Sequence, residues 1–285
     1  MPTNNGRAPK GPRCIAIVGP YLSGKTTLLE AILFRTGAIQ RQGKVSEGNT
    51  VGDASPEARS QTMSVELNVA TTTFLDETYT FIDCPGSIEF AEEARNALKG
   101  CDAAVVVCEP DDKKVPGLQL ILKELDALDL PRFLFVNKID RTEGRLRDLL
   151  GYLQPASSTP LVLRQVPIWN DGIAVGFVDL ALERAFIYRE HAASEVAEIP
   201  EELHEREKEA RFQMLEKLAD FDDELLEQLL SDMEPPPDRV FADLSRELAE
   251  GLITPVLFGS AEHGNGILRL LKALRHEAPG IADTT

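Results

Sequence analysis

The chain has 285 residues, of which 43% are hydrophobic and 27% charged, a composition typical of a globular protein with a sizeable core. No apolar run approaches the roughly 20 residues that a membrane helix needs, and the polar start MPTNNGRAPKGPR lacks the apolar stretch of a signal peptide. The net charge of −17 argues against a non-specific nucleic-acid binder.

The first elements predicted along the chain are a strand and the helix that follows it. Residues 1–12 are predicted to form a disordered polar tail. The apolar run CIAIVG at 14–19 ends in glycine and is typical of a buried strand. Apolar residues then recur at helical spacing across 24–39, which predicts a helix directly after the strand.

A hairpin is predicted next. In the stretch 64–74, Val65, Leu67 and Val69 alternate with polar neighbours, which indicates an edge strand covered on that side. The polar turn LDET separates it from the strand YTFID at 79–83. We therefore expect these two strands to pair antiparallel.

The rest of the core is predicted to alternate strands and helices. Strands are expected at 103–109, 132–138 and 254–260, and helices at 88–99, 117–129, 141–153 and 264–274. This alternation predicts an α/β fold with a mostly parallel six-stranded sheet covered on both faces. Ligands of such sheets bind at the carboxyl ends of the strands.

One segment interrupts this rhythm and is predicted to be an inserted α+β subdomain, residues 155–250. It has short strand signals at 161–168 and 173–188, and a helical, acidic stretch at 201–230. The prolines of EPPPD (234–238) stop that pattern before a last helix. Residues 151–250 contain 23 acidic and 9 basic residues, which is typical either of a solvated face or of a docking surface for a basic partner.

The stretch GPYLSGKTT (19–27) has the spacing of a phosphate-binding loop between a strand and a helix. Backbone N–H groups and the helix N-terminus make such a loop attractive to anions. Lys25 would reach the β- and γ-phosphates, and the Thr26 hydroxyl would coordinate Mg²⁺. The alternative is a glycine-rich turn without a ligand. The residues assigned to phosphate binding are Gly19, Ser23, Gly24, Lys25, Thr26 and Thr27.

A second motif, DCPG (83–86), ends the second hairpin strand. The Asp83 carboxylate could hold Mg²⁺ through water, and the Gly86 N–H could meet a γ-phosphate. Read alone, the motif is also common turn chemistry.

A third motif, NKID (137–140), follows an apolar strand and predicts recognition of guanine. The Asp140 carboxylate can accept hydrogen bonds from the N1–H and the exocyclic amine of guanine, a donor pair that adenine lacks. Lys138 would cover the base, and Asn137 would tie this loop to the phosphate loop. The alternative is a plain polar strand end. After the last strand, GSA can offer backbone N–H groups to the guanine O6; these residues are Gly259, Ser260 and Ala261.

Together these motifs resemble the Ras-like GTPases and, among them, the translational GTPases, most closely the G domain of elongation factor G. The resemblance extends from about residue 13 to residue 274. It implies a G-domain core at 13–154 and 251–276, GTP or GDP with Mg²⁺ as ligands, and a linker at 277–285 leading to further domains. It also implies that the acidic insertion contacts the ribosomal stalk protein.

The resemblance also implies roles for two residues near the γ-phosphate. ARSQTMSVE (58–66) resembles the first switch, and Thr62 falls on the threonine that binds Mg²⁺ and the γ-phosphate. DCPGSIEF places Ser87 where working translation factors have a histidine that helps the attacking water. The residues expected to act on the reacting phosphate are therefore Lys25, Thr62, Gly86 and Ser87.

Two departures from the family pattern predict slow hydrolysis. A serine at 87 lacks the reach and charge of an imidazole. Leu22 stands where the family commonly has an aspartate thought to hold a monovalent cation, although a leucine there could also simply lean on a neighbour. Both changes spare the residues that bind ground-state GTP.

Several functions stay open at this point. The first is a ribosome-linked GTP switch with mobile elements at 44–64 and 84–95. The others are a ribosome-protection or release-factor relative, a GTP-dependent interaction module without useful catalysis, and an adenine-nucleotide enzyme, which Asp140 argues against. We expect a cytoplasmic monomer with no membrane association and no sequence-specific nucleic-acid binding.

Overall fold

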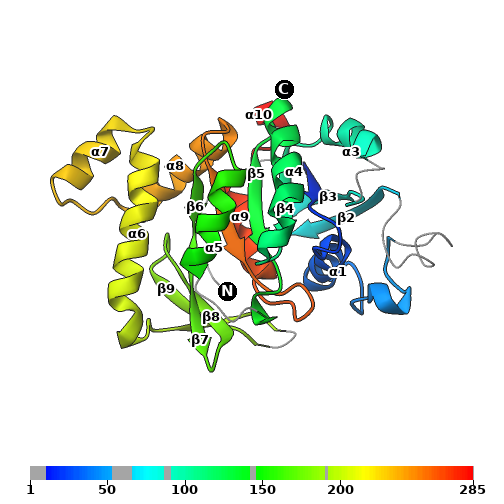
Figure 1. Ribbon diagram of the computed structural model, residues 1–285, viewed down its shortest axis with the longest axis horizontal. Helices are drawn as coiled ribbons and strands as arrows, with labels where there is room; N and C mark the ends of the chain where they lie inside the picture. Colours follow the sequence, from blue (N-terminus) through cyan, green and yellow to red (C-terminus); the bar gives the residue numbers. More distant parts are fainter. Residues whose placement is uncertain (1–10, 53–65, 87–90, 142–145, 190–191, 285) are drawn as a thin grey trace.

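The computed structural model describes residues 11–52, 66–86, 91–141, 146–189 and 192–284, and the elements that it contains are shown in Figure 1. The predicted tail lies outside these ranges up to residue 10. The strands are β1 (Arg13–Val18), β2 (Asn68–Phe74), β3 (Glu77–Asp83), β4 (Ala103–Cys108), β5 (Arg132–Val136), β6 (Leu161–Leu163), β7 (Gln165–Asn170), β8 (Ile173–Asp179), β9 (Arg184–Ile187), β10 (Glu195–Ala197) and β11 (Thr254–Phe258). The helices are α1 (Lys25–Thr36), α3 (Ala91–Leu98), α4 (Val115–Ala127), α5 (Leu146–Leu153), α6 (His204–Ala219), α7 (Asp223–Leu230), α8 (Pro237–Ala249), α9 (Ile267–Glu277) and α10 (Ile281–Thr284).

The main sheet has seven strands in the order β2-β3-β1-β4-β5-β11-β6, and every pairing is parallel except that of β2 with β3. The predicted α/β class and mostly parallel sheet are confirmed, but the predicted count of six strands is wrong. The seventh strand, β6, is only three residues long and pairs with β11. The sequence pattern merged it with β7 into one signal, because only Arg164 lies between the two strands.

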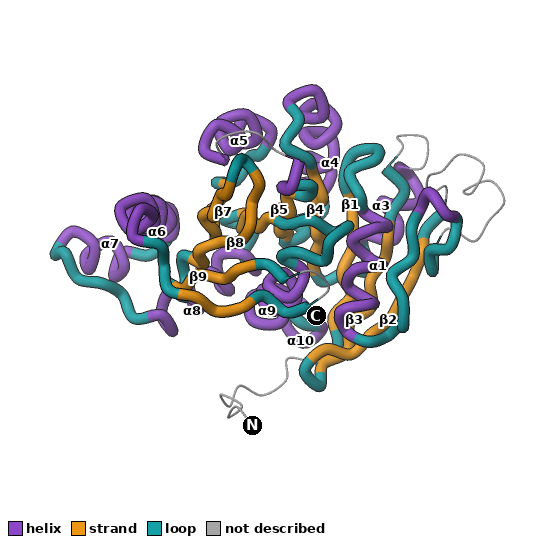
Figure 2. The backbone as a smooth tube through the Cα atoms, turned by 90° about the horizontal axis from the view of Figure 1, so that it is seen from below, coloured by secondary structure: helices purple, strands orange, loops and turns teal. Residues whose placement is uncertain are grey.

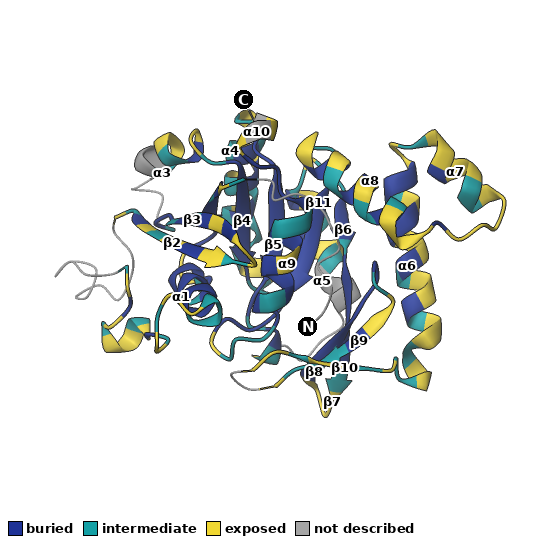
Figure 3. Ribbon diagram, turned by 180° about the vertical axis from the view of Figure 1, so that it is seen from behind, coloured by how far each residue is buried: buried dark blue, intermediate teal, exposed yellow. Residues whose placement is uncertain are grey.

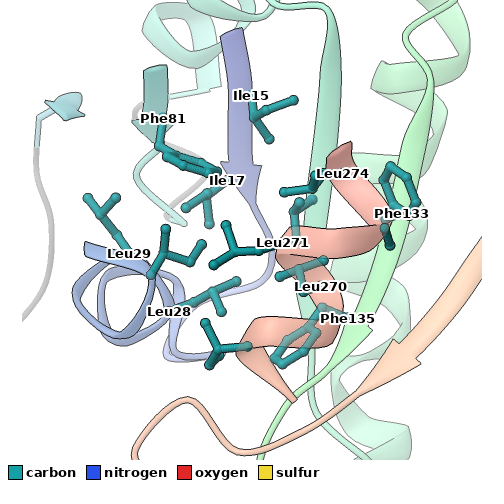
Figure 4. Close-up of a cluster of buried hydrophobic side chains, with 14 of the residues drawn as sticks. Ile15, Ile17, Leu28, Leu29, Phe81, Phe133, Phe135, Leu270, Leu271 and Leu274 are labelled. Carbon is teal, nitrogen blue, oxygen red and sulfur yellow. The ribbon is translucent and has the colours of Figure 1, made fainter. Parts of the chain in front are cut away.

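The core lies in two layers, one on each face of this sheet. Along β1, Ile15 and Ile17 point to one layer while Ala16 and Val18 point to the other, the period of two expected of a strand. Figure 4 shows the first layer, where leucines of α1 and α9 meet β-strand isoleucines and phenylalanines. In Figure 2, α4 and α5 lie on the opposite face of the sheet.

The hairpin of β2 and β3 forms as predicted, but its covered face is the other one. Val69 is 64% exposed, whereas Ala70 and Phe74 pack against the core beside α1. The residues of β2 that are buried outright are polar, Asn68 and Thr72. Packing of the hairpin against α1 therefore decides which side of β2 faces inward, and the apolar pattern of the strand does not.

A second, antiparallel sheet of order β10-β9-β8-β7 stands beside the first, with α6 next to it and α7 and α8 in contact with α6 (Figure 1). Its core joins one face of this sheet to α6 and α8, through side chains such as Val178, Leu218 and Leu244. Figure 3 shows α6 and α7 as ribbons of alternating buried and exposed residues, as expected of amphipathic helices. The acidic helical pattern at 201–230 is broken between α6 and α7, where the Asp222 side chain accepts a hydrogen bond from the Leu225 N–H at 3.0 Å and caps α7. Across the described ranges no helix is both long and apolar enough to span a bilayer.

Two buried ion pairs fasten the second sheet to α9. Arg164, between β6 and β7, donates to the Glu277 carboxylate at 2.5 Å, and both side chains are fully buried. Arg269 of α9 pairs with Asp179 at the end of β8. Breaking a buried pair leaves a charge without compensation, so these contacts fix how the second sheet sits on the core.

The Arg164–Glu277 pair supports a stability prediction. A Glu277→Gln variant is expected to lower the free energy of unfolding by about 2–3 kcal/mol, because the buried guanidinium loses its counter-charge. Urea denaturation of the nucleotide-free chain measures this change. The matched control is Glu195→Gln in the exposed pair with Arg189, where the side chains are 55% and 56% exposed and the expected change is below about 1 kcal/mol. Equal changes in the two variants would contradict the prediction.

Candidate functional site

The predicted motifs meet at the carboxyl ends of the central strands. The phosphate loop follows β1, DCPG follows β3, NKID follows β5, and GSA follows β11. Parallel strands place these ends at one edge of the sheet. The topology therefore brings the four motifs together, as the sequence predicted.

The phosphate loop depends on glycine at two positions. Gly24 has φ 94° and forms the N-cap of α1, and a Cβ at this position would lie 2.3 Å from the Asn137 amide nitrogen. A Cβ on Gly19 would lie 2.1 Å from the backbone oxygen of Val107. Between them the loop closes through a 3.2 Å hydrogen bond from the Ser23 N–H to the Pro20 oxygen. Side chains larger than hydrogen would push the loop away from its neighbours.

Leu22 lies at the outer turn of this loop. Its backbone is left-handed, with φ 58°, and its side chain is 53% exposed. About half of the residue is covered, so contact with a neighbour and the missing carboxylate both stay interpretations of this position.

Lys25 points its ammonium group into the gap between the phosphate loop and DCPG. Its Nζ donates to the Pro20 oxygen at 3.2 Å, and the side chain is buried. A Cβ on Gly86 would lie 2.3 Å from this Nζ. Glycine at 86 thus lets the DCPG backbone approach the lysine, in the place where both would face a γ-phosphate.

Thr26 and Asp83 form a direct hydrogen bond, with 2.7 Å between the threonine Oγ1 and the Asp83 Oδ2. Both residues are buried. A hydroxyl beside a carboxylate is an all-oxygen donor set, the kind that Mg²⁺ prefers, and Mg²⁺ keeps several waters that a carboxylate can hold. The two residues therefore fit a magnesium ion bound to phosphates.

Asn137 connects three of the loops. Its Nδ2 donates to the Ser23 backbone oxygen at 2.9 Å, and its Oδ1 accepts from the Ala261 N–H at 2.9 Å. The predicted tie between NKID and the phosphate loop is present in the structure. One side chain fixes the spacing between the two loops that would hold the phosphates and the base.

Lys138 follows with a strained backbone, φ 61°. Its Nζ donates to the Leu22 oxygen at 3.1 Å and pairs with Glu109 after β4. Burial raises the pKa of the Glu109 carboxyl, but hydrogen bonds from Lys114 and Lys138 outweigh burial and hold that pKa below its usual range. The stem of Lys138 is thereby stretched across the site and held at its tip, an arrangement suited to covering a flat base.

Asp140 lies two residues after Lys138, which lines the pocket, and is not itself among the lining residues. Its Oδ1 is buried and has no hydrogen-bond partner among the described residues, while Oδ2 lies 3.7 Å from Arg141 and from His263. A buried polar atom without a partner is costly in the isolated protein. The N–H donors of a guanine would satisfy it.

The N–H groups of GSA donate hydrogen bonds within the protein, and that of Gly259 donates to the Val136 oxygen at 3.0 Å. The Ala261 N–H already donates to Asn137, and the Ser260 N–H donates to the Asn265 oxygen at 3.1 Å. Donation by Ser260 and Ala261 to a guanine O6 therefore stays a prediction. A Cβ on Gly259 would lie 2.2 Å from the Asn265 oxygen, so this position also requires glycine.

A pocket of about 280 Å³ opens among these loops, close to the lower end of the range for ligand sites, about 300–1,000 Å³. Its lining includes the phosphate loop, NKID and the residue after GSA, together with residues 42–46, of which 44–46 belong to the predicted switch element 44–64. The lining residues are Gly24, Thr27, Gln42, Gly43, Lys44, Val45, Ser46, Asn137, Lys138 and Glu262. No sequence signal marks Gln42 and Gly43, because they reach the site through a loop that returns to α1, where Glu30 accepts a hydrogen bond from the Gly43 N–H.

Two of the predicted site residues lie outside the described ranges, Thr62 and Ser87. The first switch at 58–66 lies almost wholly outside them as well. Their roles rest on the sequence alone.

This chain is similar to a known protein family and to individual proteins of known sequence. Residues 10–280 match the family described as elongation factor Tu GTP binding domain. The chain is 46% identical over 267 residues to an elongation factor G-like protein of Synechocystis, covering 94% of this chain and 40% of that protein. It is 30% identical over 275 residues to elongation factor G of Salinibacter ruber, covering 95% of this chain and 39% of that protein.

Solved structures include a similar one from Thermus thermophilus. It superposes with a TM-score of 0.88 at 32% identity, covering 95% of this chain and 41% of that chain. The chain thus spans about 40% of the length of the curated relatives that it matches.

Proposed function

Because the chain belongs to the family of elongation factor Tu GTP-binding domains, we propose that it binds GTP and GDP with Mg²⁺ and serves as the ribosome-linked switch of an elongation factor G-like translational GTPase. In this proposal Lys25 and the phosphate loop hold the triphosphate, and Thr26, Thr62 and Asp83 hold the metal. Asp140 reads the guanine, with Lys138 across its face.

The observation that carries the proposal is the three-way contact of Asn137. It holds the Lys25 loop and the Asp140 loop in fixed relation, and the Asp140 Oδ1 has no hydrogen-bond partner among the described residues. A site with an unsatisfied buried acceptor discriminates strongly between ligands that can and cannot donate to it. Adenine presents no donor pair in that position.

We further propose that hydrolysis is slow. Mg²⁺ and Lys25 can stabilise the charge on the phosphates, but Ser87 cannot supply an imidazole beside the attacking water. Loss of one preorganised catalytic group commonly costs about 10²–10³ in rate. Binding of GTP is unaffected by this loss, because the residues that bind the ground state are present.

Single-turnover hydrolysis of radiolabelled GTP, measured with and without ribosomes, tests the proposal. We expect GTP to be retained on the chain at one per molecule and to be cleaved slowly. A chain that retains no GTP would refute the switch function, and fast cleavage would refute only the slow-hydrolysis part.

The second candidate function is a GTP-dependent interaction module that acts through the insertion. It is favoured by the acidic composition of residues 151–250. Within this segment, Phe212, Leu230 and Met233 are about half or more exposed. A pull-down with ribosomal stalk protein in the presence of GTP or GDP distinguishes the interaction module from the hydrolysing switch. Capture that requires GTP, together with absent hydrolysis on ribosomes, would favour the module.

The proposed binding of Mg²⁺ by Thr26 and Asp83 leads to a prediction about the rate of GDP release. Chelation of Mg²⁺ with EDTA is expected to speed GDP release about tenfold or more, because Thr26 and Asp83 would hold the ion beside the phosphates and the ion would offset their negative charge. A Thr26→Ala variant should release GDP at a rate that depends little on Mg²⁺. Thr36→Ala at the other end of α1 is the control and should keep the dependence. A wild-type release rate unaffected by EDTA would contradict the assignment.

A further inference from the structure

Glu30 is a buried carboxylate on α1 that none of the motifs accounts for. It is 1% exposed, and it lies on α1 about one and a half turns after Lys25. Its Oε2 accepts a hydrogen bond from the Gly43 N–H at 2.7 Å, and its Oε1 accepts one from the Val51 N–H. One side chain therefore binds two backbone positions that are eight residues apart.

These two bonds close a loop, residues 42–51, which we call the wall loop. Inside it, the Lys44 N–H donates to the Asn49 side chain at 2.6 Å, and Val45–Glu47 form a 3₁₀ turn ended by Gly48 at φ 60°. A Cβ on Gly43 would lie 2.5 Å from the backbone oxygen of Asn49. The loop is thus compact, and Glu30 holds both of its ends against α1.

The wall loop forms one side of the pocket. Its residues 42–46 line the cavity together with Gly24, Thr27 and Lys138, and the Gln42 Nε2 donates to the Ala261 oxygen at 3.0 Å. With phosphates on the phosphate loop and the base at Asp140, the part of a nucleotide between them is the ribose and α-phosphate. The wall loop therefore faces that part of the ligand, while Glu30 itself is not among the lining residues.

We propose that Glu30 is a positioning residue for the nucleotide. By holding Gly43 and Val51 it keeps the wall loop closed over the ribose and α-phosphate, and it thereby limits how fast a bound nucleotide leaves. This inference rests on the proposed function, since it concerns the same pocket. Two hydrogen bonds to one ionised carboxylate are strong enough for the task, because charged acceptors bind backbone N–H groups about twice as strongly as neutral ones.

The test is a Glu30→Gln variant. A glutamine can accept one backbone N–H through its oxygen, but its amide nitrogen is a donor and faces the second N–H. We expect hydrogen exchange at the Gly43 and Val51 amides of the nucleotide-free chain to quicken. We also expect dissociation of N-methylanthraniloyl-GDP to quicken about tenfold, equivalent to about 1.4 kcal/mol.

A matched control separates positioning from general stability. Glu77 is also a buried carboxylate, 5% exposed, but it pairs with Arg13 and Arg275 away from the pocket. Glu77→Gln should lower the melting temperature and leave the GDP dissociation rate unchanged. If Glu30→Gln folds poorly, Gln42→Ala provides a second test, because it removes the hydrogen bond from the wall loop to the Ala261 oxygen. GDP dissociation from this variant is expected to quicken about threefold.

Two results would overturn the inference. One is equal acceleration of GDP dissociation in the Glu30 and Glu77 variants, and the other is faster amide exchange in Glu30→Gln with an unchanged GDP dissociation rate. If the wild-type chain binds no labelled GDP, the proposed function fails, and the inference about nucleotide release fails with it. Hydrogen exchange then still decides whether Glu30 holds the loop.

Discussion

An Asp140→Asn variant is expected to lose about 10²–10⁴ in affinity for GDP and to gain affinity for xanthosine diphosphate. The carboxylate would accept two hydrogen bonds from guanine, and bonds to a charged group contribute about 1.5–3 kcal/mol each. Asparagine offers one acceptor and one donor, and the donor faces the guanine amine. Xanthine carries an oxygen in place of that amine, so the same donor suits it. The affinities for GDP and xanthosine diphosphate are measured by letting each compete with fluorescent GDP, for the wild type and for the variant.

The control for this prediction is Asp129→Asn. Asp129 is exposed and precedes β5, whereas Asp140 follows the same strand at its other end. The substitution is chemically identical but lies away from the pocket, and GDP affinity should not change. If Asp140→Asn bound GDP as tightly as the wild type, the base would have to be recognised by other residues.

A Ser87→His variant is expected to cleave GTP about 10²–10³ faster than the wild type in single turnover on ribosomes. The imidazole would restore a group that can orient or stabilise the attacking water, which the short hydroxyl of serine cannot do. The affinity for GDP should stay the same, because the role proposed for position 87 concerns the reacting phosphate only.

Ser87→Ala provides the comparison. If the serine takes no part in cleavage, the alanine variant should hydrolyse GTP at the wild-type rate. A histidine variant no faster than wild type would place the slow step elsewhere, with Leu22 as the next position to change.

Much of the site could be read from the sequence because its residues stand at fixed distances from strand ends. The strand before Gly19 and the strand before Asn137 are continuous apolar runs, and parallel packing alone brings their ends together. The spacing of Gly19, Gly24 and Lys25 then specifies a phosphate loop. These are local patterns, and the structure contains them where they were expected.

What could not be predicted depends on contacts between distant segments. The strand β6 is too short to show a period, and it is recognisable only through its pairing with β11. The inward face of β2 is set by α1, against the apolar pattern of the strand. The role of Glu30 cannot be read from α1 alone, because its hydrogen-bond partners Gly43 and Val51 lie in the wall loop. Tertiary context overrides local pattern in each case.

The most direct test of the account is calorimetric titration of the chain with GDP and, separately, with ADP in the presence of Mg²⁺. We predict one GDP site per chain with an affinity at least about 100-fold above that for ADP, the discrimination expected when a buried acceptor must be satisfied. Equal affinities for the two nucleotides, or no heat with GDP, would contradict the assignment of Asp140 and the phosphate loop to a guanine-nucleotide site.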